Sequence, residues 1–196
     1  MATIRILLGI ICLVGIGRSW NVGSRNLNYV SCKIGLHDHL FSNEAQDLAI
    51  LKVLNLAKAE IGVRELTGKN DGERVEAYLN YVNVKKGQPW CAAFVSWVFW
   101  KAGFAKPKTA WSPGLFPSRR LAYIGKAGFV FGIYFSNLKR IAHCGFVVKI
   151  NGSWLQTIEG NTNAEGSREG NGVYRKRRHV NTIRYYADWI GKDIKP

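Results

Sequence analysis

The sequence lacks the long apolar run that a membrane-spanning helix requires. Its most hydrophobic stretch, from Ile6 to Gly17, has twelve residues, whereas a helix that crosses a bilayer needs about 20. We therefore expect no stable membrane span. The chain also contains no internal repeat and no low-complexity tract, which excludes a solenoid built from stacked repeats.

Cysteines are few, and their spacing does not suit a metal. The four cysteines, at positions 12, 32, 91 and 144, form no Cys-x-x-Cys pair and no Cys/His cluster with zinc spacing. We predict no metal and no other cofactor. Neither Cys12, inside the apolar run, nor Cys32 has the setting of a lipid-attachment site. Loss of Cys12 with the N-terminal segment would leave three cysteines, and an odd number in an exported protein indicates a free thiol.

Acidic residues are scarce as well. The chain has 13 acidic and 28 basic residues, with a net charge of +15. This excess favours anionic partners: nucleic acid, acidic lipid surfaces or anionic cell-wall polymers. The basic run from Arg175 to Arg178 falls on an expected strand, either as a solvated edge protected by charge or as an attractor of wall polymers and peptide carboxylates. No recognised nucleic-acid-binding module accompanies it, so we expect no nucleic-acid partner.

The N-terminal apolar stretch is typical of a secretory signal. Arg5 precedes it, its length suits the central region of such a signal, and Gly15 and Gly17 are small residues suited to a cleavage site. An uncleaved anchor or a buried strand is the alternative. We expect residues 1–17 to be the signal or anchor, and the protein to be exported to the periplasm, the cell envelope or the medium. Residues 18–43 would be a polar arm, and residues 192–196 a tail.

The remaining residues, 44–191, are expected to form one domain with helices first and strands second. Apolar residues recur at helical spacing after Asn43, which with Gln46 resembles a capping box, and Gly62 is a plausible stop. Further helices are expected from Asp71 to about Val82, from Pro89 to before Gly103, and briefly at Ser112. From Phe129 onward, β-branched and aromatic runs alternate with Gly and Asn, which predicts strands. The fold class is therefore α+β, with N-terminal helices packed on a C-terminal antiparallel sheet of about five to six strands.

Cys91 lies in the stretch "QPWCAAFVSWVFW", at the expected first turn of the third helix. The helix dipole and the unpaired backbone N–H groups at that position lower the pKa of a thiol. The same N–H groups can stabilise an oxyanion. Cys91 is thus a candidate nucleophile, although an ordinary buried core cysteine is the alternative.

A cysteine nucleophile needs a base and a group that orients the base. His143 is the only histidine within the expected sheet, and Glu159 and Asn161 lie on the following strand. A two-residue turn at Asn151-Gly152 would place Glu159 on the face opposite His143. A three-residue loop, 150–152, pairs His143 with Glu159 and is the arrangement we predict.

The same alternation of strand residues concerns the neighbouring cysteine. Cys144 is expected to point away from the face that carries His143, into the core and opposite Ile158. If His143 reaches Cys91, Cys144 should then not reach it, so a disulfide between Cys91 and Cys144 is not expected.

Three motifs together resemble the CHAP family, the cysteine- and histidine-dependent amidohydrolases and peptidases of papain-like fold. They are "QPWCAAFVSWVF", "IAHCGFVV" and "IEGNTN", in that order, and the resemblance covers about residues 44–191. It implies that Cys91 is the nucleophile, that His143 is the general base and acid, and that Glu159 or Asn161 orients the histidine. Some members bind calcium ahead of the cysteine, but the corresponding stretch "TGKNDGERVEAY" has no dense acidic loop.

The resemblance further implies hydrolysis of an amide bond in peptidoglycan, either as an N-acetylmuramoyl-L-alanine amidase or as a peptide endopeptidase. Peptidoglycan or its stem peptides would be the partner, and a monomer is expected. Gln88, Trp90 and Trp111 are candidate substrate-binding residues, with capping or packing as the alternative for each. Two other functions stay open: a non-catalytic basic module that binds the wall, and a secreted antibacterial amidase toxin.

Overall fold

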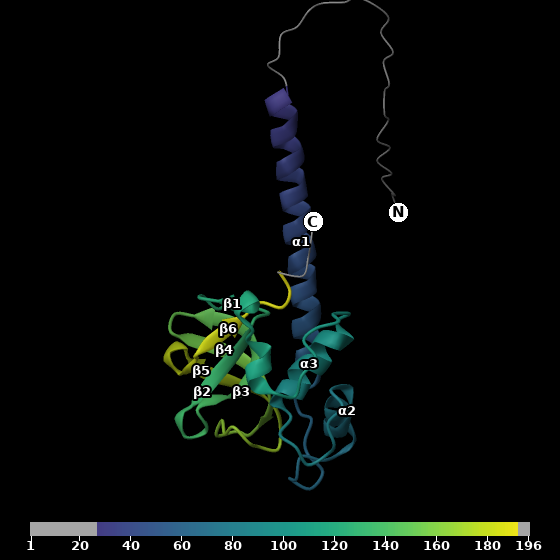
Figure 1. The fold of residues 1–196 in the computed structure, drawn as a ribbon, viewed down its shortest axis with the longest axis vertical. Helices are drawn as coiled ribbons and strands as arrows, with labels where there is room; N and C mark the ends of the chain where they lie inside the picture. The colour runs from purple at the N-terminus through teal and green to yellow at the C-terminus, as the bar shows by residue number, and fades with distance from the viewer. Residues whose placement is uncertain (1–26, 192–196) are drawn as a thin grey trace, which may run out of the picture. The chain divides into compact units, whose positions relative to one another are not determined.

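The computed structural model describes residues 27–191, and side chains from residue 43 onward. The expected signal or anchor therefore lies outside the described residues. The chain divides into two units at residue 38, and the second unit holds the sheet and all the side chains discussed below. Three α-helices precede the strands (Figure 1): α1 (Leu27–Ala59), α2 (Glu73–Tyr81) and α3 (Cys91–Lys101). No helix within the described part is long and apolar enough to cross a membrane.

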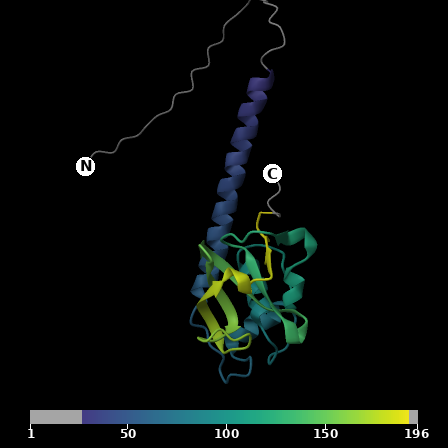
Figure 2. The same ribbon diagram turned by 90° about the vertical axis from the view of Figure 1, so that its left-hand side faces the viewer.

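One antiparallel sheet of six strands follows the helices. Its strands are β1 (Leu121–Ala122), β2 (Val130–Phe135), β3 (Arg140–Asn151), β4 (Trp154–Thr162), β5 (Gly172–His179) and β6 (Tyr185–Ala187). They lie side by side in the order β1-β6-β2-β3-β4-β5, so β5 with its basic run is an edge strand. In Figure 2 the sheet faces the viewer. The expected α+β architecture, with N-terminal helices on a C-terminal sheet, is confirmed.

Helix α3 is the centre of the core, because every residue from Cys91 to Phe99 is buried. It packs on β3 and β4, and on α2 from its other side. Phe146 and Ile158 of the sheet join its hydrophobic cluster. Glycine is required where helix and sheet touch: a Cβ at Gly160 would lie 2.7 Å from the Trp90 ring and 2.9 Å from Phe94. The start of α3 is therefore pressed directly onto β4.

Two expected helix starts are wrong. Helix α1 begins at Leu27, so Asn43 lies inside it and caps no helix end at that position. Helix α2 begins after Gly72 with no side-chain cap. Asp71 instead accepts hydrogen bonds from the backbone N–H of Thr67 at 2.9 Å and from its hydroxyl at 2.7 Å. The carboxylate of Asp71 thus closes the loop before α2, and Gly72 occupies the N-cap position of the helix.

The hairpin between β3 and β4 differs from the predicted one. Asn151 pairs with Trp154, so the turn is Gly152-Ser153, and Gly152 has φ +55°. Phe146, not Cys144, pairs with Ile158. The register shifts by one residue at Val148, between the pairs at Val147 and Lys149. This β-bulge restores the alternation that the shorter turn would have broken. The predicted loop was wrong, yet the two faces of β3 and β4 match as the site requires.

Candidate active site

Cys91 is the first residue of α3, where helix geometry leaves backbone N–H groups without helical partners. The residue is almost fully buried, with 4% of its surface exposed. The sulfur lies 3.4 Å from Ser112 Oγ in a hydrogen bond that either atom can donate. Ser112 opens the short 3₁₀ turn η1 (Ser112–Leu115), close to the short helix expected there. The thiol thus has the helix-start setting that lowers its pKa.

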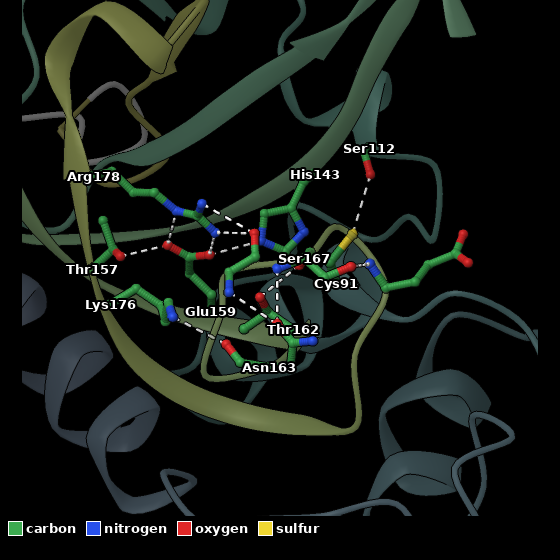
Figure 3. Close-up of polar contacts among 12 residues, drawn as sticks. Cys91, Ser112, His143, Thr157, Glu159, Thr162, Asn163, Ser167, Lys176 and Arg178 are labelled. Carbon is green, nitrogen blue, oxygen red and sulfur yellow. Dashed lines mark hydrogen bonds and ion pairs between the residues drawn. The ribbon is translucent and has the colours of Figure 1, made fainter. Parts of the chain in front are cut away.

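His143 lies between Cys91 and Glu159 (Figure 3). Its Nε2 is 2.8 Å from Glu159 Oε2, and both side chains are buried. Its Nδ1 is buried and has no hydrogen bond of normal geometry within residues 27–191. In Figure 3 the ring turns its other edge toward the sulfur of Cys91. The imidazole is therefore anchored at one nitrogen and directed to the thiol at the other.

The carboxylate of Glu159 is held by Thr157 and Arg178 as well as by His143. Thr157 Oγ1 donates to Glu159 Oε1 at 2.5 Å. Arg178 donates to both carboxylate oxygens, from Nε at 3.0 Å and from Nη2 at 2.6 Å. Arg178 also donates to the backbone carbonyl of Gly166, at 3.2 Å from each terminal nitrogen. The carboxylate thus has a fixed position and a compensated charge.

Neither Arg178 nor Thr157 was anticipated from the sequence. Arg178 is the last residue of the basic run that was interpreted as a solvated edge or an attractor of anions. The exposure of that run alternates, with Arg175 and Arg177 exposed and the side chain of Arg178 only 15% exposed. Period-two alternation on an edge strand was an available signal that part of the run faces inward.

The hydrogen bonds of Asn161 go to residues other than His143. With its amide oriented to satisfy its neighbours, its oxygen accepts from the backbone N–H of Trp90 at 3.2 Å. Its nitrogen donates to the carbonyl of Gly170 at 3.0 Å and to Asn70 Oδ1 at 3.2 Å. Asn161 has φ +55°, in the left-handed region that asparagine tolerates. It ties the start of α3 to β4, and Glu159 is the residue that bonds the histidine.

The charges of the site stabilise one another. Burial alone would raise the pKa of Glu159, but hydrogen bonds from His143 and Arg178 lower this pKa to about 2. Burial alone would lower the pKa of His143, but interaction with the Cys91 sulfur and the hydrogen bond with Glu159 raise this pKa to about 9. A protonated imidazole beside an ionised carboxylate is the state that stabilises a neighbouring thiolate.

Cys144 lies closer to Cys91 than expected. The pKa of Cys91 is well below its ordinary value, and its hydrogen bond with the Cys144 thiol is the largest cause. Burial opposes this shift, and His143 adds to it. Burial raises the pKa of Cys144, which keeps its proton. Both cysteines are free thiols. The prediction that Cys144 does not reach Cys91 was wrong, whereas its expected core position and the expected lack of a disulfide with Cys91 are confirmed.

A cleft of about 370 Å³ opens at Cys91. Gln88 and Trp111, two of the candidate substrate-binding residues, line it together with Ser112. Trp90, the third candidate, is fully buried and packs on Tyr78, with ring centroids 5.5 Å apart. Its indole N–H donates to Glu65 Oε1 at 2.8 Å. Trp90 is therefore a core residue that anchors the start of α3, and not part of the cleft wall.

Neither a family model nor a curated protein matches the chain. Among solved structures, the crystal structure of Ly7917 matches with a TM-score of 0.44 and 16% identity, over 72% of this chain and 62% of that chain. The crystal structure of Ly7917 with the hydrolyzing product of MDP matches with a TM-score of 0.42 and 15% identity, over 70% and 61%. The chain thus spans about three-fifths of the length of these chains. A likeness of this degree assigns neither a family nor an activity.

Proposed function

We propose that the protein is an exported cysteine hydrolase of the CHAP type, which cleaves an amide bond of peptidoglycan. The observation that carries this proposal is the position of His143. It is bonded to Glu159 at 2.8 Å through Nε2, with its free Nδ1 directed to a cysteine at a helix start. A histidine with a purely structural role needs no nucleophile beside its second nitrogen, whereas a general base that accepts a thiol proton needs the thiol there.

The residues present can perform each step of amide hydrolysis. His143 already holds the proton of Cys91 as an imidazolium, and the thiolate attacks the carbonyl carbon. The oxyanion that forms is stabilised by backbone N–H groups at the start of α3. The imidazolium then gives its proton to the nitrogen of the scissile amide, and the amine leaves. His143 next removes a proton from water as the water attacks the acyl-enzyme; the C–S bond breaks, the acid leaves, and the thiolate–imidazolium pair is restored.

Glu159 and Arg178 act on the histidine and not on the substrate. Glu159 fixes the tautomer that keeps a proton on Nε2 and leaves Nδ1 free to accept one, and it stabilises the imidazolium. Arg178 keeps Glu159 ionised and in place. This division of roles supports an enzyme over a wall-binding module, because a binding module needs no buried network of ionised side chains next to a thiol. The amidase, the endopeptidase and the antibacterial toxin share this chemistry.

The experiment uses purified peptidoglycan and mass spectrometry of the soluble products. Wild type should release fragments with a new amine and a new carboxylic acid, and Cys91→Ala should reduce turnover by roughly 10⁴-fold or more. The masses identify which amide is cut. Equal inertness of both proteins, with wall binding retained, would establish the binding module instead.

A further inference from the structure

The cleft at Cys91 has basic walls. Arg140 and Arg168 line it, and none of its described lining residues is acidic. A second pocket of about 630 Å³ adjoins it through Arg140, which lines both. Its other charged lining residues are Lys139 and Arg184, and it too has no described acidic residue. The two pockets, which share the wall formed by Arg140, are together called the arginine groove here, and Cys91 lines the first of them.

The cations of the arginine groove come from separate parts of the chain. Lys139 and Arg140 lie at the start of β3, Arg168 lies between β4 and β5, and Arg184 directly precedes β6. A protein with a charge of +15 has basic patches in many places. Charge on the walls of a cleft acts more strongly than charge on an open surface, because low-dielectric walls focus the field.

Aromatic rings hold two of these guanidinium groups. Arg140 lies over the ring of Trp111, 4.4 Å from its centroid, and donates one bond to the carbonyl of Ile141 at 3.0 Å. Arg184 lies over Tyr185 at 5.4 Å. Neither arginine forms an ion pair with any described residue. A stacked guanidinium keeps its outward N–H groups available for a carboxylate.

Arg168 differs, because it pairs with Glu169. The side chains of this pair are 26% and 52% exposed. An ion pair that is this exposed to solvent contributes little to stability. An incoming carboxylate with two parallel hydrogen bonds can therefore displace Glu169 from Arg168.

We propose that the arginine groove selects peptides that carry free carboxylates. Arg140 and Arg168 would receive a carboxylate next to the scissile amide, and Lys139 with Arg184 would receive one further along the peptide. This inference rests on the proposed function and narrows its substrate to wall peptides with free acids, as opposed to peptides whose acids are carboxamides.

The test compares two synthetic wall peptides that differ only in a carboxylate or a carboxamide beside the scissile bond. Wild type should show kcat/KM about tenfold or more higher for the carboxylate peptide, as for one charge-assisted contact. Arg140→Gln and Arg168→Gln should each lose more activity on the carboxylate peptide than on the carboxamide peptide. Arg175→Gln, on the exposed edge of β5, is the matched control and should keep the preference.

Binding to Cys91→Ala, measured by calorimetry, separates this inference from the proposed function. The carboxylate peptide should bind about tenfold more tightly than the carboxamide, and Arg168→Gln in the same background should remove the difference. Discrimination in binding without any cleavage by wild type would overturn the proposed function and leave the arginine groove standing. Cleavage of both peptides at equal rates, with equal losses in the arginine variants, would overturn the arginine groove alone.

Discussion

Arg178 from the edge strand β5 bonds both carboxylate oxygens of Glu159, at 3.0 and 2.6 Å. It compensates a carboxylate that is completely buried. Removal of one partner from such a pair leaves an uncompensated charge, which costs far more than the pair contributes as a whole.

Arg178→Met should therefore destabilise the fold strongly. We expect its free energy of unfolding, from chemical denaturation, to fall by about 3 kcal/mol or more. Arg175→Met is the control on the exposed side of the same strand and should change stability by about 0.5 kcal/mol or less. Equal stability of the two variants would show that Arg178 contributes nothing to the burial of Glu159.

The two free cysteines should react differently with an alkylating agent. The lowered pKa of Cys91 raises the thiolate fraction of its sulfur, whereas the raised pKa of Cys144 keeps that sulfur protonated. Iodoacetamide at pH 7 should therefore label Cys91 at least about tenfold faster than Cys144. Peptide mapping by mass spectrometry measures both rates. Similar rates would contradict the assignment of Cys91 as nucleophile.

Cys144→Ala removes the hydrogen bond that contributes most to the low pKa of Cys91. The pH profile of Cys91 alkylation should move to higher pH, with little change in its plateau. Cys144→Ser restores a donor and should return most of the shift. An unchanged profile in Cys144→Ala would mean that His143 and the helix start alone ionise the nucleophile.

Glu159 should make stability depend on pH in the acid range. Its pKa in the folded protein, about 2, is below its ordinary value of 4.5. A group with a lowered pKa stabilises the fold fully above the ordinary value and loses that contribution as the pH falls toward the folded value. The free energy of unfolding of wild type should thus exceed that of Glu159→Gln at pH 6, and the difference should shrink between pH 4.5 and 2. A difference independent of pH would exclude this contribution.

Gly160→Ala should disturb the start of α3, because the new Cβ would meet the rings of Trp90 and Phe94. Overpacking of this kind costs about 1–3 kcal/mol. Thermal denaturation should show a lower Tm, and alkylation of Cys91 should slow, since the helix start moves away from His143. A lower Tm with unchanged alkylation would show that the helix shifts as a rigid body with its site intact.

The sequence predicted those features of the fold and the site that depend on short, local residue patterns. Cys91 was placed at a helix start because Pro89 and the apolar run after it are local signals, and α3 begins at that residue. The α+β order of elements follows from the change of periodicity near Phe129. The pairing of His143 with Glu159 was also expected, since alternation along two adjacent strands restricts which residues can meet.

The parts that were missed depend on long-range pairing. Arg178 reaches Glu159 only because β5 pairs with β4, and no short window contains both residues. Asn161 was the alternative to Glu159 as the residue that orients His143. Its backbone is left-handed, however, and its amide oxygen accepts a hydrogen bond from the N–H of Trp90. How close Cys144 comes to Cys91 depends on the angle at which α3 packs on the sheet. Alternation along one strand does not predict that angle.

The bulge at Val148 separates the hairpin into a tip and a base that tolerate changes of length differently. Deletion of Val148 would make the pairs Val147–Thr157 and Lys149–Gln156 consecutive, so the hairpin would lose its bulge. His143 would stay on the same face of the sheet as Glu159. Residues inserted between Gly152 and Ser153 would lengthen only the tip. Deletion of a single residue between His143 and Val148 would instead turn His143 away from Glu159. A peptide tag or a binding loop can therefore be grafted at the tip while His143 and Glu159 stay in register.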